Sequence, residues 1–214
     1  RVFFSGGDNF RFAVMPEYKA NRDNVERPYY LDAAKAYATH KWDAEVHDAL
    51  EADDMMCIIQ MTDLKNFIIC SRDKDVRQCP GWHYSWECGK QASIGPMWVD
   101  VLGELKLTQK LDDKGKVKEN KVFGTGEKFF YYQLLVGDTV DNVGGIKGKG
   151  AMFAYTLLKG ATTVRECYEL VSEVYKEHHK ELWKEKFREQ ADLLYMIRNV
   201  DDKGEKVKWR PPEK

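Results

Sequence analysis

Three clusters of carboxylates border apolar segments of the chain, although acidic residues usually lie on solvated surfaces. An apolar run follows the first cluster, and apolar runs precede the other two. This arrangement predicts that the acids lie at the ends of buried elements and gather at one edge of a sheet. Two carboxylates about 4 Å apart repel each other by roughly 4 kcal/mol at an effective dielectric near 20. The pattern therefore predicts a divalent-metal site formed by Glu51, Asp53, Asp54, Asp73, Asp75, Asp138 and Asp141.

The first two clusters also have an ordinary structural interpretation. The acids of segment 51–54 stand at the start of an expected helix, where the positive end of the helix dipole favours them. Asp73 and Asp75 would point to the same side of an extended segment and could grip a hard cation. An N-terminal helix cap is the simpler explanation of Asp75 on its own. No cluster is therefore specific by itself.

Two further segments suit contact with a polyanion. Tyr18, Lys19 and Arg22 combine an aromatic ring with cations, which suits base stacking and phosphate contact, although a solvated loop is the ordinary alternative. The glycine-rich segment contains Gly145, Ile146, Lys147, Gly148, Lys149 and Gly150. Glycines let the backbone approach a phosphate, and the N–H groups of a following helix can bind it. The spacing does not fit a nucleotide-binding P-loop.

Composition bounds the possibilities without selecting a function. The 214 residues fit one large domain, and 34 Lys and Arg against 35 Asp and Glu give a net charge of −1. No apolar run reaches the roughly 18 residues that a membrane span needs, and these 214 residues show no secretory signal pattern. The five cysteines favour reduced, buried thiols. A zinc site from Cys70, Cys79, His83 and Cys88 is the weaker alternative, because it lacks short paired spacing.

The first half of the chain alternates expected strands and helices. Strands are expected at 2–5, 67–70 and 82–88, and helices at about 30–39 and from 51 onward. Strand, acid and helix in alternation predict a parallel α/β sheet whose ligand site lies at the carboxyl ends of the strands.

The second half is expected to be different. Segment 98–123 is predicted to be a β-hairpin, because Asp112-Asp113-Lys114-Gly115 forms a turn between two charged, alternating segments. Helices are expected at about 126–136 and 151–159. The last third is expected to be helical, with Trp183, Phe187, Leu194 and Ile197 on one face.

In this order, the motifs resemble those of the 5′→3′ exonuclease and flap-endonuclease family, most closely its small bacteriophage members. The matching segments are 10–11 and 16–22, Glu51-Ala52-Asp53-Asp54, Ser71-Arg72-Asp73-Lys74-Asp75 and 137–150. They run from near Val2 to about Lys159. The resemblance implies a PIN-like α/β fold with a parallel sheet flanked by helices, a helix–two-turn–helix motif and a helical C-terminal part. Residues 1–125 would form the catalytic domain, with the hairpin as an insertion, and 126–214 the DNA-binding and helical region.

The resemblance implies a hydrolase that cuts DNA phosphodiester bonds with two divalent ions, Mg²⁺ or, in its place, Mn²⁺. The implied ligands are Glu51, Asp53 and Asp54 for the first ion, and Asp73, Asp75, Asp138 and, through water or an outer shell, Asp141 for the second. Lys19 and Arg22 would neutralise the charge that develops on the phosphate. Tyr18 would stack on the base beside the cut.

The resemblance also implies the partner and its setting. Residues 145–150 would grip duplex DNA without reading its sequence, and K⁺ could bind there as in some relatives. The substrates would be 5′ ends, flaps or nicked duplex, in DNA replication. The protein would act as a monomer in the cytoplasm, or in the host cytoplasm if a phage encodes it.

Two departures from the family pattern keep an alternative open. The family places one essential Asp on a first strand that would lie upstream, in a span of roughly 60–80 residues. A second Asp is expected at the end of the strand 2–5, where this chain has Ser5, and only Asp8 could substitute for it. A catalytically incomplete, structure-specific DNA-binding module is therefore the alternative. An unrelated phosphohydrolase acting on small phosphoesters is the third possibility.

Overall fold

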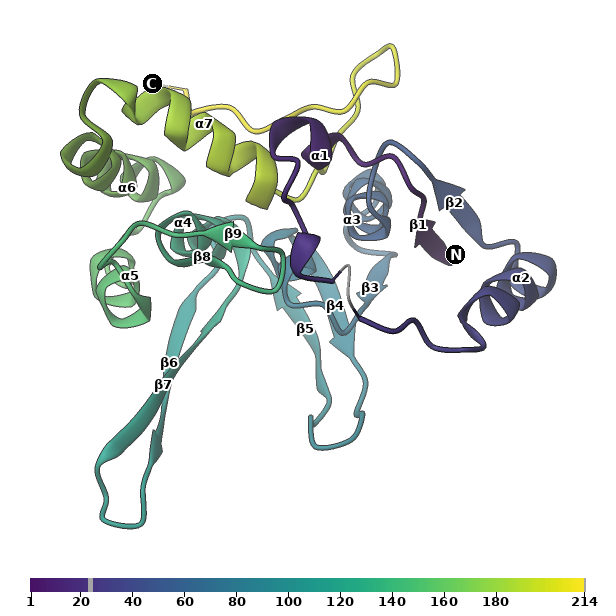
Figure 1. Ribbon diagram of the computed structural model, residues 1–214, viewed down its shortest axis with the longest axis horizontal. Coiled ribbons are helices and arrows are strands. Elements are labelled where there is room, and N and C mark those ends of the chain that lie inside the picture. Colours follow the sequence, from purple (N-terminus) through teal and green to yellow (C-terminus); the bar gives the residue numbers. More distant parts are fainter. Residues whose placement is uncertain (23–24, 214) are drawn as a thin grey trace.

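The chain forms a mixed α/β structure with two β-hairpins that project from a helical body (Figure 1). The computed structural model describes residues 1–22 and 25–213. Within this part of the chain, no helix is long and apolar enough to cross a lipid bilayer.

The strands of the first half form two separate hydrogen-bonded sheets. Strand β1 (Phe3–Ser5) pairs in parallel with β2 (Glu45–His47). Strand β3 (Ile68–Cys70) pairs in parallel with β4 (Gly81–Ser85), which pairs in antiparallel with β5 (Ile94–Val99). The expected strands are present, but the expectation of one wholly parallel sheet is wrong. Strand β5 is antiparallel because a short connection returns the chain beside β4.

Helices are present at the expected positions, and α1 (Phe10–Val14) is a further short helix that the sequence did not predict. The other helices are α2 (Leu31–Trp42), α3 (Ala52–Thr62), α4 (Gly126–Val136), α5 (Ala151–Leu158), α6 (Val164–His179) and α7 (Trp183–Leu194). Shorter 3₁₀ turns are η1 (Ala20–Arg22), η2 (Asp75–Gln78) and η3 (Lys180–Leu182). Ile197 lies beyond the end of α7, so its expected place on the helical face is wrong, although its side chain is buried.

The expected hairpin is present as β6 (Leu105–Leu111) and β7 (Val117–Gly124), which pair in antiparallel and extend away from the body (Figure 1). It begins later than expected because residues 94–99 belong to β5. At its tip, the Asp112 carboxylate accepts hydrogen bonds from the backbone N–H groups of Lys114 and Lys116. This Asx-type geometry is the reason that the expected turn forms here.

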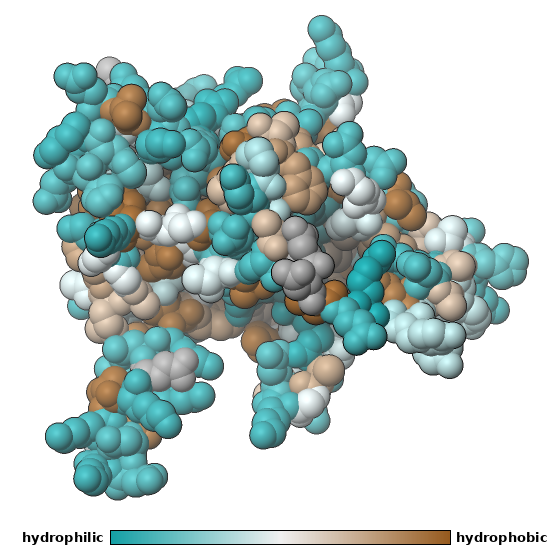
Figure 2. All heavy atoms as spheres, viewed as in Figure 1, coloured by the Kyte–Doolittle hydropathy of each residue, from teal (hydrophilic) through white to brown (hydrophobic). Residues whose placement is uncertain are grey.

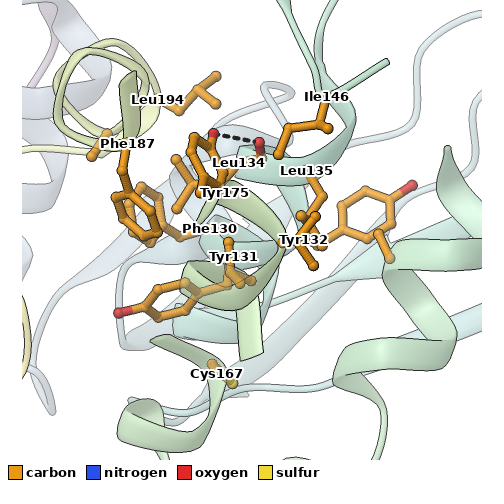
Figure 3. Packing of buried hydrophobic residues seen from close by; sticks show 14 of the residues in the cluster. Phe130, Tyr131, Tyr132, Leu134, Leu135, Ile146, Cys167, Tyr175, Phe187 and Leu194 are labelled. Carbon is orange, nitrogen blue, oxygen red and sulfur yellow. Dashed lines mark hydrogen bonds between the residues drawn. The ribbon is translucent and has the colours of Figure 1, made fainter. Parts of the chain in front are cut away.

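Helix α4 is the centre of the hydrophobic core (Figure 3). Ten of its eleven residues are buried, and α5, α6 and α7 pack around it. The Tyr175 hydroxyl of α6 donates a hydrogen bond to the Leu134 carbonyl oxygen at 2.8 Å. The short strands β8 (Gly137–Asp138) and β9 (Val143–Gly144) follow α4 directly. Asp138 is thereby attached to the central helix of the core. The expected division into two regions at residue 125 stays a prediction.

A buried histidine in β4 predicts a pH dependence of stability. Burial lowers the pKa of His83 to about 4, and its Nε2–H donates to the Cys79 carbonyl oxygen at 2.8 Å. The unfolded chain therefore binds the proton more tightly. The stabilisation is fully present above the unfolded pKa of about 6.5 and is lost as the pH falls through about 4. The free energy of unfolding should fall by about 2–3 kcal/mol more in the wild type than in His83→Gln between pH 7 and 4.5, measured by urea unfolding. Equal losses in the two proteins would contradict the role of His83.

Candidate functional site

The acids of the second and third clusters lie on the wall of an open cavity of about 1120 Å³. Asp73 and Asp75 reach it from the segment that follows β3. Asp138 and Asp141 reach it from the segment that follows α4. The remaining walls are formed by β4 and β5 on one side and by the β6–β7 hairpin on the other. Two acidic clusters that are more than sixty residues apart in sequence therefore meet at one solvent-accessible place.

Asp73 links the first cluster to the other two. Burial, and then the charge of Asp73, raise the pKa of Asp53 to about 7. Burial and Asp73 likewise raise the pKa of Asp75 to about 8, and Asp138 adds to this effect. Glu51 acts on Asp53 in the same direction. The charges of carboxylates from all three segments therefore act on one another.

Lys74 partly neutralises this charge from inside the cluster. Its ammonium lies 2.7 Å from Asp138 Oδ2. Burial opposes the charge of Lys74, but Asp75 and Asp138 outweigh burial and raise the pKa of the ammonium. Asp138 is itself almost fully buried, and its Oδ1 accepts a hydrogen bond from the Val140 N–H at 2.9 Å.

Glu51 connects the acids to the basic segment. Its Oε1 is paired with the ammonium of Lys19. Its Oε2 accepts a hydrogen bond from the Tyr18 hydroxyl at 3.1 Å and lies 3.4 Å from Arg11 Nη1. As the N-cap of α3, Glu51 also takes part in a capping box with Asp54. In the first cluster, Glu51 and Asp54 therefore cap α3, while Asp53 lies near Asp73 of the second cluster.

Asp54 is a structural residue, which corrects its expected place near a metal. It is fully buried, and its two oxygens accept hydrogen bonds from the Arg11 guanidinium at 2.7 and 2.9 Å. Oδ1 also accepts from the Ile197 N–H at 2.9 Å, and Oδ2 from the Glu51 N–H at 3.2 Å. Both oxygens are therefore occupied by donors of the protein itself.

The basic segment folds against the third cluster. The Lys19 N–H donates to the Asp141 carbonyl oxygen at 2.9 Å, and the Arg22 guanidinium lies 2.5 Å from Asp141 Oδ1. Lys19 and Arg22 thus stand beside the acids, as a phosphate-neutralising role requires. Tyr18 is only 2% exposed, and its hydroxyl donates to Asp141 Oδ2 at 2.9 Å. The expectation that the Tyr18 ring stacks on a base is wrong for this structure, because the ring lies in the core.

The glycine-rich segment forms a tight turn before α5. Ile146 is buried and anchors the turn, and its N–H donates to the Leu135 carbonyl oxygen at 2.8 Å. Its side chain is thus not available to DNA, which corrects that expectation. Gly148 has a φ of +79°, which favours glycine. Lys147 is exposed, whereas the ammonium of Lys149 lies 4.3 Å from the centre of the Phe153 ring.

The rest of this segment is available to a ligand. Gly145 and Gly150 are exposed, and Gly150 is the N-cap of α5. The first N–H groups of α5 have no partner within the helix and can bind an anion. The expected phosphate contact is therefore compatible with the geometry and stays a prediction.

Several residues at the site carry roles that the sequence did not assign. Gln133 of α4 donates a hydrogen bond to Asp75 Oδ1 at 2.6 Å, and Gln78 donates to Gln133 at 2.7 Å. The Ser5 hydroxyl accepts a hydrogen bond from the Ala52 N–H at 3.0 Å and so supports the start of α3. The available signal was Gln133, which lies within the apolar run 129–136, since a buried amide needs partners.

A divalent ion fits the chemistry of this cluster. Among residues 1–22 and 25–213, no three acidic, His or Cys side chains form a ready-made metal site. The cysteines of this region are free, and the zinc alternative gains no support. The carboxylates offer the oxygen ligands that hard cations prefer. Burial, and then the charge of Asp73, raise the pKa of Asp53 and of Asp75, and a bound cation would favour the ionised form of both carboxyl groups.

Comparison with known proteins gives relatives that are distant or much longer. No family model matches the chain. It is 28% identical over 166 residues to DNA polymerase I of Pseudomonas aeruginosa and 26% identical over 209 residues to DNA polymerase I of Bacillus subtilis. These alignments include 74% and 89% of this chain, but only 16% and 21% of the polymerases. The chain therefore spans about a fifth or less of the curated relatives that it matches.

The fold comparison finds proteins of bacteriophage T5. The D15 protein co-crystallised with metal ions matches with a TM-score of 0.46 and 15% identity, covering 91% of this chain and 85% of that one. The T5 D15 flap endonuclease, as a complex with DNA and metal ions, matches with a TM-score of 0.47 and 13% identity over 91% and 84% of the two chains.

Proposed function

We propose that this chain is a divalent-metal-dependent 5′ nuclease of the 5′→3′ exonuclease and flap-endonuclease family. The observation that carries the proposal is the meeting of Asp53, Asp73, Asp75 and Asp138 beside an open cavity. These acids come from three segments whose motifs match the family in order. The sequence similarity to two DNA polymerase I proteins supports DNA as the polymer.

Two Mg²⁺ ions, or Mn²⁺ in their place, are the proposed cofactors. When bound, such ions generate a hydroxide and stabilise the charge on the scissile phosphodiester. Glu51 and Asp53 would serve one ion, and Asp73, Asp75 and Asp138 the other. Asp141 would act from the outer shell, because Tyr18 and Arg22 already occupy its oxygens.

The basic residues of the site would bind and orient the phosphate. Lys19 and Arg22 are held at the edge of the acid cluster by Glu51 and Asp141. A phosphate bound beside Asp141 would meet both cations, which can neutralise the charge that develops during cleavage. Lys74 holds Asp138 in place within the same cluster.

The DNA would extend from the cavity to the glycine-rich turn. Exposed Lys147, the glycines and the first N–H groups of α5 suit contact with a phosphate backbone without reading bases. We further propose a PIN-like fold with a helix–two-turn–helix motif at residues 126–159 and K⁺ binding at the turn. The protein would act as a monomer in the cytoplasm, of the host if phage-encoded, in DNA replication.

A substrate with a 5′ flap and a label at the 5′ end tests the function directly. The chain should release short labelled products with Mg²⁺ or Mn²⁺ and none with EDTA. A blunt duplex, a nicked duplex and a flap of RNA in the same assay would define the preferred structure and polymer. Binding without cleavage in every metal would reject the nuclease assignment.

Ser5 favours a second candidate function, a DNA-binding module without catalysis. The family pattern expects a carboxylate here, but Ser5 uses its hydroxyl to accept a hydrogen bond from the start of α3. This candidate predicts salt-sensitive binding to flapped or nicked duplex and no turnover. The same labelled substrate separates the two, because only a nuclease shortens it. Hydrolysis of substrates in a panel of small phosphoesters would instead identify an unrelated phosphohydrolase.

Metal binding should stabilise the protein through the acid cluster. An ion that binds only the folded state adds about 2.7 kcal/mol at a concentration of 100 times its Kd. Saturating Mg²⁺ should therefore raise the Tm by about 5–10 °C at pH 8, measured by differential scanning fluorimetry. NaCl at matched ionic strength is the control, and Asp75→Asn should reduce the shift. A shift that NaCl reproduces would show screening rather than a metal site.

A further inference from the structure

The β6–β7 hairpin carries its lysines on one particular face. In the antiparallel register, Lys106 is opposite Phe123, and Thr108 is opposite Lys121. Side chains alternate between the two faces of a strand pair. Lys106, Thr108 and Lys110 therefore share a face with Lys121 and Phe123, and also with Glu119, which is opposite Lys110. The hairpin thus has one face on which cations are concentrated.

This lysine-bearing face looks toward the acid cluster. Thr108 and Lys121 line the same cavity as Asp73 and Asp138. The opposite face begins with Leu105 and Val122, which pack against the hydrophobic core. The core therefore fixes the rotation of the hairpin, so that its cations and not its apolar residues face the cavity.

The root of the hairpin is anchored beside the acids. Arg77 lies two residues after Asp75, and its guanidinium carbon is 4.3 Å from the centre of the Phe123 ring and 5.8 Å from that of Phe129. Gly103, with a φ of +68°, passes so close to the Thr125 carbonyl that a Cβ atom would clash. This anchoring fixes the direction in which the hairpin leaves the body.

The charge and length of the hairpin suit a nucleic-acid backbone. Residues 105–124 contain six lysines and three acids, a net charge of +3. The hairpin projects from the body as a polar extension (Figure 2). A strand of seven residues such as β6 spans about 23 Å. Duplex DNA of that length has about seven base pairs and a negative charge every 1.7 Å or so.

We propose that the β6–β7 hairpin is a nucleic-acid-binding arm whose lysine-bearing face follows the phosphate backbone away from the acid cluster for about seven base pairs. The inference rests on the proposed function, because it takes the polymer at the acids to be DNA. The contacts would be made by Lys106, Lys110 and Lys121, which share one face of the hairpin. Of these three, Lys121 also lines the cavity beside the acids. They hold the duplex without reading its sequence.

Substitution of these three lysines by glutamine tests the arm. The triple variant Lys106→Gln, Lys110→Gln, Lys121→Gln should bind a flap substrate with a duplex of about 20 base pairs about 10- to 100-fold more weakly near physiological salt. The slope of log K against log salt should be less steep by about 2–3, because each lost phosphate contact removes about 0.9. The matched control is Lys176→Gln, Lys184→Gln, Lys203→Gln, which removes three exposed charges outside the cavity.

Measuring affinity on duplexes of different length shows whether the lysines contact DNA along the hairpin or only change the charge near the cavity. With only about four base pairs beside the flap, too few to follow the arm, the triple variant and the wild type should bind equally well. Equal weakening on short and long duplexes would overturn the proposal. The proposal would also be overturned if the triple variant bound the long duplex as tightly as the control variant does. The exposed tip residues Leu111 and Val117 would then indicate contact with a protein instead. If the wild type binds no DNA, the proposed function itself fails, which is a different result.

Discussion

Replacement of Arg11 by Met should lower the free energy of unfolding by about 3–5 kcal/mol, because it leaves a buried carboxylate without its partner. Arg11 and Asp54 are both completely buried, and two hydrogen bonds of 2.7 and 2.9 Å join them. The Arg11 guanidinium also donates to the carbonyl oxygens of Leu193 and Tyr195, both at 2.9 Å. It therefore ties α1 to the start of α3 and to the segment at the end of α7. Urea unfolding at pH 7.5 measures the loss, which corresponds to a Tm lower by about 10 °C.

The reference for this prediction is the double variant Arg11→Met, Asp54→Asn. The amide introduced at position 54 is uncharged, but its oxygen can still accept the hydrogen bond from the Ile197 N–H. We expect the double variant to recover at least about 2 kcal/mol relative to Arg11→Met, because the unpaired charge is gone. Equal instability of both variants would show that the loss comes from packing and from the two carbonyl contacts.

Replacement of Asp73 by Asn should stabilise the metal-free protein and abolish its activity. Asp73 is the exposed acid that raises the pKa of both Asp53 and Asp75. Loss of its charge relieves two repulsions at once, so the free energy of unfolding at pH 8 in EDTA should rise by about 1 kcal/mol. Loss of a proposed metal ligand should lower the cleavage rate by at least about 100-fold.

The opposite signs of these two effects distinguish a functional acid from a structural one. Removal of a surface carboxylate outside the cluster, as in Asp202→Asn, should change neither stability nor rate. Asp138→Asn should also lose activity, but it should lower stability because it leaves Lys74 without its closest partner. If Asp73→Asn unfolds more readily than the wild type in EDTA, the acids are not crowded enough to require cations. Full activity in Asp73→Asn would remove Asp73 from the metal site.

The sequence alone determined the local elements and which acids could meet. The hairpin turn at residues 112–115 and the buried helix at 126–136 follow from nearest neighbours along the chain, since turn residues and apolar periodicity act locally. Asp73 and Asp138 could be selected as candidates because each stands at the end of an apolar run. When several strands and helices end at the same edge of a fold, their last residues lie close together, even if these residues are far apart in the sequence.

The tertiary structure decided which acids are open to a ligand and which are used by the protein itself. Asp53 and Asp54 are neighbours at the start of α3, yet Asp53 is repelled by Asp73 while Asp54 pairs with Arg11, 43 residues away. The position of Tyr18 also depends on other segments. Burial of its ring and hydrogen bonds from its hydroxyl to Glu51 and Asp141 make the buried position more stable than an exposed one. Periodicity describes the face of one element and contains no information about the partner that another element brings. Only the folded chain therefore shows that Arg11 neutralises Asp54 and that Arg22 pairs with Asp141.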